Sequence, residues 1–350
     1  MRAITVTPGV PGAAQLTELD DPCPSGDELL VEMLALGVCG TDREIVAGEY
    51  GWAPAGSRRL VLGHESLGRV REGSNGAFRP GDLVAGIVRR PDPEPCPCCS
   101  RGEFDMCRNG RYRERGIKEL DGFGAELVTL EPDFAVKLDS ELGLLGVLTE
   151  PTSVVAKAWE QIDRARVQVC RPLETVLVTG AGPIGLLAAL LGTQRDLQVH
   201  LLDRIREGPK RELAQDLGAT YHSGSLADAC GAAEPDVIVE CTGVPEVVVD
   251  AMQSTAPGAI VCLLGVSPRG RVLNVDAGAL NDELVLENDM VFGSVNANHR
   301  HFQAAADALA AADPGWLERL ITRRVSLGRW SEALERRPDD IKNVIEFASE

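Results

Sequence analysis

The chain has 350 residues, enough for two domains, and 44% of them are hydrophobic, so a sizeable core can form. Aromatic residues make up only 4%, which predicts a core built from aliphatic side chains and alanine. The formal net charge of −18 opposes non-specific binding to nucleic acids or anionic membranes, because both require a basic surface.

Residues 1–150 consist of short apolar runs, such as DELLVEMLALGV at 27–38, separated by glycine, proline, aspartate and asparagine. This pattern predicts a small β-rich domain with glycine-rich turns. The first ten residues alternate like a strand and lack the apolar segment of a signal peptide. We therefore expect a cytoplasmic protein, in which the ten cysteines are free thiols or metal ligands rather than disulfides.

Three short stretches of this region offer metal ligands beside apolar runs. They are GVCGTD with Cys39, LGHESLG with His64 and Glu65, and LTEPTSV with Glu150. Singly, each residue has a simpler explanation: a small core cysteine, a hydrogen-bonded core histidine, an acid at a helix N-terminus. Together they supply one sulfur, one imidazole and one carboxylate, and three protein ligands with an open fourth position are typical of catalytic zinc.

Residues 175–296 have a different pattern. TVLVT, VHLLD, DVIVEC, AIVCLL and MVFGSV read as buried strands, and helix-like stretches alternate with several of them, which predicts a parallel α/β sheet. The long apolar run at 175–192 is interrupted by glycines and a proline, which argues against a membrane span. Two final helices are expected near 301–312 and 340–349.

The most specific pattern in this region is G-x-G-x-x-G, formed by Gly180, Gly182 and Gly185 between a strand and a helix, with Pro183 and Ile184 inside it. The glycines allow the tight turn, the approach of a pyrophosphate and close packing of helix on strand, so the loop predicts a dinucleotide site rather than an ordinary turn. Asp203 ends the next strand, where a carboxylate can accept hydrogen bonds from an adenosine ribose; the alternative is an ordinary exposed aspartate.

The order Cys-Gly-Thr-Asp, Gly-His-Glu, a cysteine-rich segment, Glu-Pro and the glycine loop resembles the zinc-containing medium-chain dehydrogenases over nearly the whole chain. ERGI at 114–117, DGFGAE at 121–126 and GSVNANHRHF at 293–302 resemble the microbial, notably archaeal, glucose dehydrogenase branch. The resemblance implies an α/β fold: a Rossmann doubly wound parallel sheet at 167–297, and a β-rich GroES-like catalytic domain from 1–166 and 298–350. The active site would lie in the cleft between them.

The resemblance also implies roles for single residues. Zinc would be held by Cys39, His64 and Glu150, with Glu65 either exchanging onto the metal or lying behind its ligands. Thr41 would pass the released proton toward solvent, although Arg43 and Glu44 stand where relatives have the next member of the relay. The remaining implied contacts are with the cofactor (Arg204, Thr242, Gly265 and Asn296) and with the substrate (Glu114 and Asn296).

Two departures weaken the implied sugar site: Val154 replaces an acidic residue of one branch, and Val88 or Arg89 replaces an asparagine. The family's structural zinc pattern, C-x2-C-x2-C-x7-C, is matched by Cys96, Cys99 and Cys107, but its first position falls on Pro93. Asp92, Glu94 or Cys98 could supply the fourth ligand in place of the missing cysteine. Bound zinc, free thiols and a disulfide all stay open for this segment.

The function implied is hydride transfer from the C1 hydroxyl of an aldose such as glucose to a nicotinamide cofactor. Asp203 favours NAD, whereas Arg204 and Arg206 could pair with the phosphate of NADP. The alternatives are a zinc dehydrogenase for another polyol, amino sugar or secondary alcohol, and a catalytically silent nucleotide-binding sensor. A homodimer or homotetramer is expected from the resemblance, with no nucleic-acid or membrane partner.

Overall fold

A computed structural model of the chain describes residues 1–73, 76–169 and 172–347. The chain divides into two compact units: the first contains Met1–Ser153 and Asn296–Glu350, and the second contains Val154–Val295. Helix α2 (Thr149–Val169) begins in the first unit and continues into the second. These units differ from the domains expected from the sequence mainly in the assignment of α2.

The second unit contains one parallel sheet in the order β14-β13-β12-β15-β16-β17. Its strands are β12 (Thr175–Thr179), β13 (Gln198–Leu202), β14 (Thr220–His222), β15 (Val237–Glu240), β16 (Ile260–Leu263) and β17 (Met290–Gly293). Its helices are α3 (Pro183–Thr193), α4 (Pro209–Asp216), α5 (Leu226–Ala233), α6 (Pro245–Gln253) and α7 (Ala277–Leu286). This order is that of the Rossmann fold and confirms the parallel sheet expected from the sequence.

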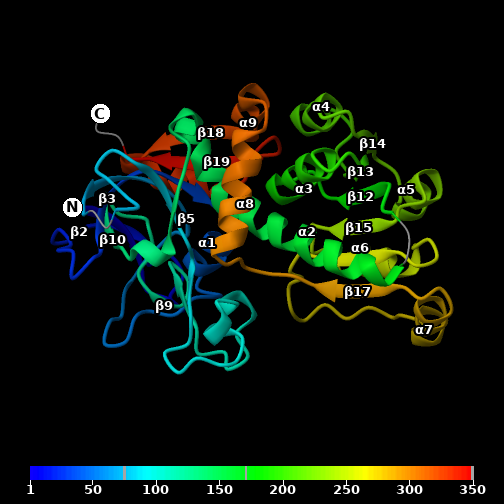
Figure 1. The fold of residues 1–350 in the computed structure, drawn as a ribbon, viewed down its shortest axis with the longest axis horizontal. Coiled ribbons are helices and arrows are strands. Elements are labelled where there is room, and N and C mark those ends of the chain that lie inside the picture. The colour runs from blue at the N-terminus through cyan, green and yellow to red at the C-terminus, as the bar shows by residue number, and fades with distance from the viewer. Residues whose placement is uncertain (74–75, 170–171, 348–350) are drawn as a thin grey trace. The chain divides into compact units, whose positions relative to one another are not determined.

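Apolar strands covered on both faces explain why this sheet forms. Strand β12 is buried at every position after its first, as a strand between two helical layers requires. Helix α3 packs against α4, and α5 packs against α6, so the helices form two layers about the sheet (Figure 1). Leu177, Ile238 and Val261 of three adjacent strands are fully buried in one of its hydrophobic clusters.

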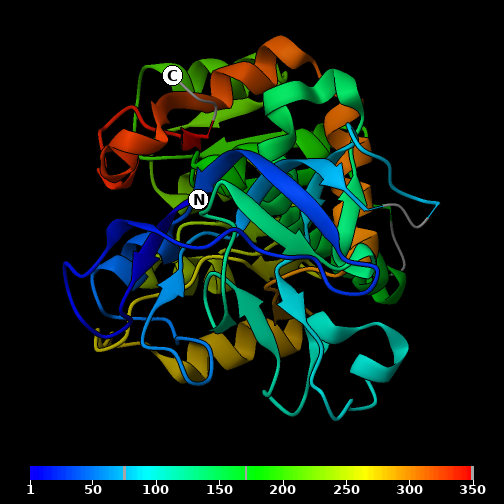
Figure 2. The same ribbon diagram turned by 90° about the vertical axis from the view of Figure 1, so that its left-hand side faces the viewer.

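The first unit is rich in antiparallel strands, seen from its own side in Figure 2. Its strands are β1 (Arg2–Val6), β2 (Gln15–Glu18), β3 (Leu29–Val38), β4 (Leu60–Val61), β5 (Glu65–Glu72), β6 (Leu83–Gly86), β7 (Arg89–Arg90), β8 (Arg113–Arg115), β9 (Glu119–Leu120), β10 (Leu127–Leu130), β11 (Ala135–Lys137), β18 (Ile321–Ser326) and β19 (Lys342–Glu346). Its helices are α1 (Gly40–Val46), α8 (His299–Ala310), α9 (Pro314–Leu320) and α10 (Trp330–Leu334). Strand β3 organises the unit, because β5, β10 and β19 all pair with it.

One element differs in kind from the prediction. A helix was expected near 340–349, but β19 is a strand that pairs with β3 and β18 (residues 348–350 lie outside the described part). Its first four residues are all buried, and it includes the β-branched pair Val344 and Ile345, which suits a strand between two neighbours. The other expected helix, near 301–312, is confirmed as α8.

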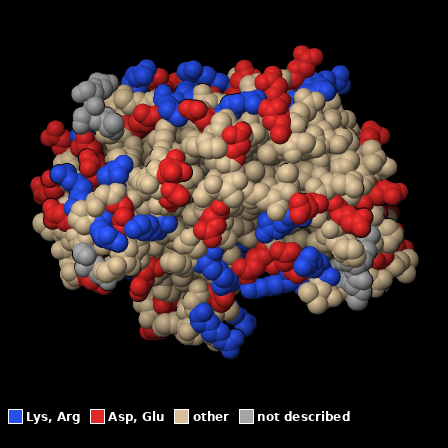
Figure 3. All heavy atoms as spheres, turned by 45° about the horizontal axis from the view of Figure 1, so that its top comes forward, with Lys and Arg blue, Asp and Glu red and all other residues tan. Residues whose placement is uncertain are grey.

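The surface carries many charged side chains of both signs, interspersed on the face drawn in Figure 3. Among the described residues, no helix combines the length and the apolar composition that crossing a membrane requires.

Candidate active site

Strand pairing brings three candidate metal ligands of the first unit together. Gly37 near the end of β3 pairs with Glu65 at the start of β5, Cys39 follows β3, and His64 precedes β5. The ligand atoms of Cys39, His64 and Glu65 lie within 4.8 Å of one another. His64 and Glu65 are buried, so this group of donor atoms is enclosed by protein.

Asp42, in the first turn of α1, holds two of these residues in position. Its carboxylate accepts a hydrogen bond of 2.8 Å from the backbone N–H of Cys39, and its Oδ1 lies 3.3 Å from Nδ1 of His64. Because Nδ1 faces Asp42, Nε2 is the His64 nitrogen left for a metal. Burial lowers the pKa of His64, but the Asp42 carboxylate and Cys39 outweigh it and hold this pKa well above its ordinary value.

Glu65 has a buried cationic partner. Both carboxylate oxygens lie 2.7 Å from Nζ of Lys342, which comes from β19, and the two side chains are 1% and 2% exposed. Burial alone would lower the pKa of Lys342, but the charge of Glu65 raises it above its ordinary value. Both oxygens of Glu65 are therefore already engaged in a buried ion pair.

Glu150 lies in the first turn of α2, outside the group of atoms within 4.8 Å. Burial by the surrounding protein raises the pKa of Glu150 to about 7, although part of its surface is accessible. The charge of His64 lowers this pKa, and the charge of Glu65 raises it. Glu150 therefore belongs to the same neighbourhood and is less tightly engaged than Glu65.

The donor set fits zinc. It contains a sulfur, an imidazole nitrogen and carboxylate oxygens, which are the ligands zinc takes in proteins. Oδ1 of Asp42 and Nδ1 of His64 are buried and face each other at 3.3 Å, which leaves Nε2 of His64 and the sulfur of Cys39 for the metal.

In the second unit, the glycine loop has the geometry a dinucleotide requires. Gly180 has φ +87°, and a Cβ on Gly185 would lie 1.8 Å from the carbonyl oxygen of Gly180, so both positions need glycine. A Cβ on Gly182 would meet nothing within 4 Å, so this side of the loop is open to a ligand. Pro183 and Ile184 begin α3, whose N-terminus points its free N–H groups at the same place.

Asp203 does more than end β13. Its Oδ2 accepts a hydrogen bond of 2.7 Å from the N–H of Ala181, and its Oδ1 accepts one of 2.9 Å from Ile205. The carboxylate thus ties the glycine loop to the turn that carries Arg204 and Arg206. These two arginines are exposed, and neither side chain has a partner within the part of the chain described.

Thr242 and Gly265, two further expected cofactor residues, lie around a buried glutamate that the sequence analysis missed. Glu240 is 0% exposed and accepts hydrogen bonds from the N–H and the hydroxyl of Thr242 and from Thr179. Gly265 approaches the same turn so closely that a Cβ would lie 2.0 Å from the nitrogen of Gly243. The signal for Glu240 was a lone acid at the end of a buried strand, VIVEC.

Glu114 and Asn296, expected to contact the substrate, are bonded to each other. The side-chain amide of Asn296 donates to Oε1 of Glu114 at 2.6 Å, and Asn296 holds the uncommon φ of +64°. Arg89 donates to the same oxygen through Nε at 3.1 Å and Nη2 at 2.9 Å. Oε2 of Glu114 has no partner among the described residues and is available to a ligand.

The cysteine-rich segment forms a loop-rich lobe of the first unit (Figure 2). The sulfurs of Cys96, Cys99 and Cys107 lie within 4.8 Å of one another, and all three are free thiols. Hydrogen bonds from the backbone of Arg108 and Cys99 lower the pKa of Cys96 to about 6. The three sulfurs fit three positions of a zinc site, but none of the proposed substitutes for the fourth joins them within that distance.

Comparison with known proteins finds two family models, which match different parts of the chain. A family model described as Glucose dehydrogenase C-terminus matches residues 143–347, and one described as Alcohol dehydrogenase GroES-like domain matches residues 25–140. The chain is 39% identical over 361 residues to the glucose 1-dehydrogenase of Methanocella arvoryzae, with 100% of both chains covered. It is 40% identical over 353 residues to that of Thermoproteus tenax, with 99% of each covered. The chain belongs to the glucose dehydrogenase branch of the zinc-dependent medium-chain dehydrogenases.

A solved structure supports the same family. The glucose dehydrogenase of Haloferax mediterranei in complex with NADP, Zn and gluconolactone has a TM-score of 0.92 and 33% identity to this dehydrogenase, over 100% of both chains. The fold class expected from the sequence is thereby confirmed. This relative was solved with zinc and a nicotinamide cofactor, the two groups that the sequence predicts for the present chain. The roles of single residues stay predictions.

The structure also gives the partners of Arg43, which follows Thr41 in α1, and of Glu114. Arg43 donates at 2.8 Å to the carbonyl of Leu334 and packs against the C-terminal segment, so it is not placed as a proton carrier. Glu114 is buried and its ion pair is with Arg89, so it does not form a surface pair with either neighbouring arginine, Arg113 or Arg115.

Proposed function

We propose that this dehydrogenase oxidises the C1 hydroxyl of an aldose such as glucose to a lactone. The observation that carries the proposal is that the buried Glu114 carboxylate has one oxygen bonded within the protein and one oxygen without a partner among the described residues. Its Oε1 is held by Arg89 and Asn296, and Oε2 is left to accept a hydrogen bond from a sugar hydroxyl. A buried carboxylate fixed in this way favours polyhydroxylated substrates over simple alcohols, because a ligand without hydroxyls leaves it unpaired.

When bound, zinc supplies a Lewis acid for the substrate hydroxyl, and the nicotinamide ring accepts the hydride. Cys39, His64 and Glu150 would hold the metal, and Asp42 orients His64 for it. Glu65 stays behind the ligands because Lys342 engages both of its oxygens. Thr41 lies in α1 beside Cys39, where its hydroxyl would carry the released proton away.

A panel of aldoses, polyols, amino sugars and secondary alcohols, with cofactor reduction followed by absorbance, tests the substrate class. The highest kcat/KM is expected for an aldose. A secondary alcohol or polyol with the highest value would favour the alternative enzyme, and the absence of turnover with every compound would favour a silent nucleotide sensor.

Replacing Glu114 by glutamine should raise KM for glucose much more than KM for a simple alcohol. Losing the hydrogen bond to a sugar hydroxyl costs about 1–3 kcal/mol, and a simple alcohol does not make that bond. The measurement is steady-state kinetics with both substrates. Since the change also leaves Arg89 without its charge partner, thermal unfolding is measured in parallel. An equal rise in both KM values would leave the sugar interaction unsupported.

For the cofactor, NAD is expected to be preferred with measurable NADP activity. Asp203 would meet a 2′-phosphate with like charge, whereas Arg204 and Arg206 would attract it. Asp203→Asn should shift the ratio of kcat/KM toward NADP by about ten-fold or more, since like-charge contacts are costly. Asparagine can still accept a hydrogen bond from the loop, which makes it a better variant than alanine. Arg204→Ala should shift the ratio the other way, and a strong NADP preference of the unchanged enzyme would contradict the prediction.

A homodimer formed through the second unit is also proposed. Strand β17 ends the sheet, and no described strand pairs with its outer edge. Helix α7 has no buried residue, and Val285 and Leu286 at its end are 63% and 76% exposed. An apolar surface beside an open strand edge is suited to pairing with a second copy. Leu286→Asp should lower the mass measured by light scattering, whereas Val167→Asp, an exposed position on α2, should not.

The cytoplasm is the compartment we propose. The described cysteines are all free thiols, and this supports a reducing environment.

A further inference from the structure

Aromatic side chains are scarce in this chain but gather beside Glu114. The sequence has three tyrosines and four tryptophans. Two of those tyrosines, Tyr50 and Tyr112, and one of the tryptophans, Trp52, lie around the turn formed by residues 114–119. None of the three has a role in the metal centre or the cofactor loop.

Backbone pairing fixes Trp52 against this turn. Trp52 forms a parallel bridge with Lys118; its N–H donates to the carbonyl of Ile117 at 2.9 Å, and its carbonyl accepts from Glu119 at 3.0 Å. The N–H of Lys118 in turn donates to the carbonyl of Glu114 at 2.9 Å. The position of Trp52 relative to Glu114 is therefore set by hydrogen bonds of the main chain.

The rings of the cluster contact one another or the charged residues of the Glu114 network. Tyr50 and Trp52 lie edge to face, with centroids 5.0 Å apart and planes at 73°. Arg89, the ion-pair partner of Glu114, lies 3.7 Å from the ring centre of Tyr112, and the ammonium of Lys118 lies 4.3 Å from it. Burial raises the pKa of Tyr50, and the charge of Glu114 raises it further, so Tyr50 also lies within the field of this carboxylate.

Tyr50 and Trp52 are exposed, Tyr112 is half-buried, and each of the three has a polar group without a partner in the described chain. Tyr50 is 42% and Trp52 is 46% exposed. The hydroxyls of Tyr50 and Tyr112 and the indole N–H of Trp52 have no hydrogen-bond partner within the described part of the chain. Rigid apolar rings with free polar tips, next to fixed polar groups, form the kind of surface that binds the apolar face and the hydroxyls of a sugar ring.

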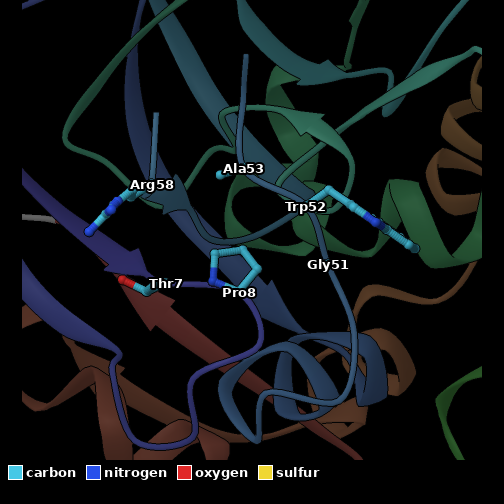
Figure 4. A pocket seen from close by; sticks show the side chains of 6 residues that line it. All are labelled: Thr7, Pro8, Gly51, Trp52, Ala53 and Arg58. Atoms are coloured by element: carbon cyan, nitrogen blue, oxygen red, sulfur yellow. The ribbon is translucent and has the colours of Figure 1, made fainter. Parts of the chain in front are cut away.

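A hollow of about 470 Å³ beside Trp52 is a separate feature. Its lining residues are Thr7, Pro8, Gly51, Trp52, Ala53 and Arg58 (Figure 4). Figure 4 shows the Trp52 side chain pointing away from Pro8 and Arg58, so the indole ring is not directed into this hollow.

We propose that Tyr50, Trp52 and Tyr112 form a second sugar subsite, which binds a pyranose ring attached to the ring that is oxidised. The proposal rests on the proposed function, because Glu114 would bind the first ring. A neutral sugar suits the cluster, because Glu114 balances the charge of Arg89 and the ammonium of Lys118 donates to the carbonyl of Gly110. The substrates that fit are reducing disaccharides, which would be oxidised at the same C1 hydroxyl and give a lactone and the reduced cofactor.

The test compares glucose with maltose and cellobiose in steady-state kinetics. We expect the unchanged enzyme to oxidise at least one disaccharide. Trp52→Ala should raise KM for that disaccharide by about three- to ten-fold, the range that corresponds to one aromatic contact, and should leave KM for glucose within about two-fold. Trp52→Phe keeps an aromatic ring, so its KM for the disaccharide should stay close to that of the unchanged enzyme. Val10→Ala, at an exposed apolar position of the same unit, should change neither KM.

Equal changes of KM for glucose and for the disaccharide in Trp52→Ala would overturn the subsite. So would oxidation of glucose by the unchanged enzyme without oxidation of either disaccharide. If none of the three sugars is oxidised, the proposed function fails, and the subsite is then judged by binding alone. In that case maltose should quench tryptophan fluorescence in the unchanged protein but not in Trp52→Phe, and the absence of this difference would overturn the subsite independently.

Discussion

Replacing Cys39 by serine is expected to remove nearly all sugar oxidation while the fold is retained. The thiolate is the soft ligand of the metal site proposed with His64 and Glu150, and a serine hydroxyl does not replace it for zinc. Changes behind metal ligands already cost about 10–100-fold in activity or metal affinity, so loss of a ligand should cost at least about 100-fold. The measurements are kcat/KM, zinc content by mass spectrometry and far-ultraviolet circular dichroism.

Cys23→Ser provides the matched control, because Cys23 is an exposed free thiol that is not one of the expected metal ligands. It should keep full activity and zinc content. His64→Ala should resemble Cys39→Ser, and the unchanged enzyme should contain between one and two zinc ions per chain, depending on the lobe of Cys96, Cys99 and Cys107. Full activity of metal-stripped protein would contradict the whole assignment.

Replacing Lys342 by methionine is expected to give the largest loss of stability of any single change in the first unit. Glu65 would be left as a buried charge without a partner, and breaking a buried ion pair in this way costs about 3–5 kcal/mol. Denaturant unfolding followed by circular dichroism measures the change, in the presence and absence of a zinc chelator. The chelator separates the stability of the ion pair from that of the metal.

Lys137→Met is the control for this change. Lys137 lies 2.8 Å from Asp82, a distance similar to that in the buried pair, but its side chain is 46% exposed. Surface pairs contribute only about 0–1 kcal/mol, so this variant should unfold nearly as the unchanged protein does. The double variant Glu65→Gln with Lys342→Met removes the unpaired charge and should recover part of the loss. If Lys342→Met and Lys137→Met lost the same stability, burial of the Glu65–Lys342 pair would have no energetic consequence.

Local patterns were sufficient to predict the glycine loop and five of the six strands of the second unit. The glycines of the loop after β12 are required by contacts between neighbouring residues, such as the close approach of Gly185 to Gly180. The buried strands are continuous apolar runs because both faces of a parallel sheet are covered. Strand β14 was not predicted, since it is a three-residue strand at the sheet edge and is only partly buried.

The charged partners in the first unit could not be predicted in the same way. Lys342 is 277 residues from Glu65, and Arg89 is 25 residues from Glu114, so each pair depends on strand pairing. The error at β19 has the same origin, because its neighbours β3 and β18 decide that it is a strand. A lysine and an asparagine preceding Val344 and Ile345 gave no alternation of apolar and polar residues to indicate this.

The position of Lys342 also has a consequence for biosynthesis. Ribosomes deliver the chain from its N-terminus, so all of Val154–Val295 emerges while the sheet of the first unit still lacks β18 and β19. A nascent chain halted before β19 already carries every expected ligand of the catalytic metal, but the carboxylate of Glu65 has no counter-charge. Assembly of the metal centre in its final form therefore has to wait until β19 has been translated.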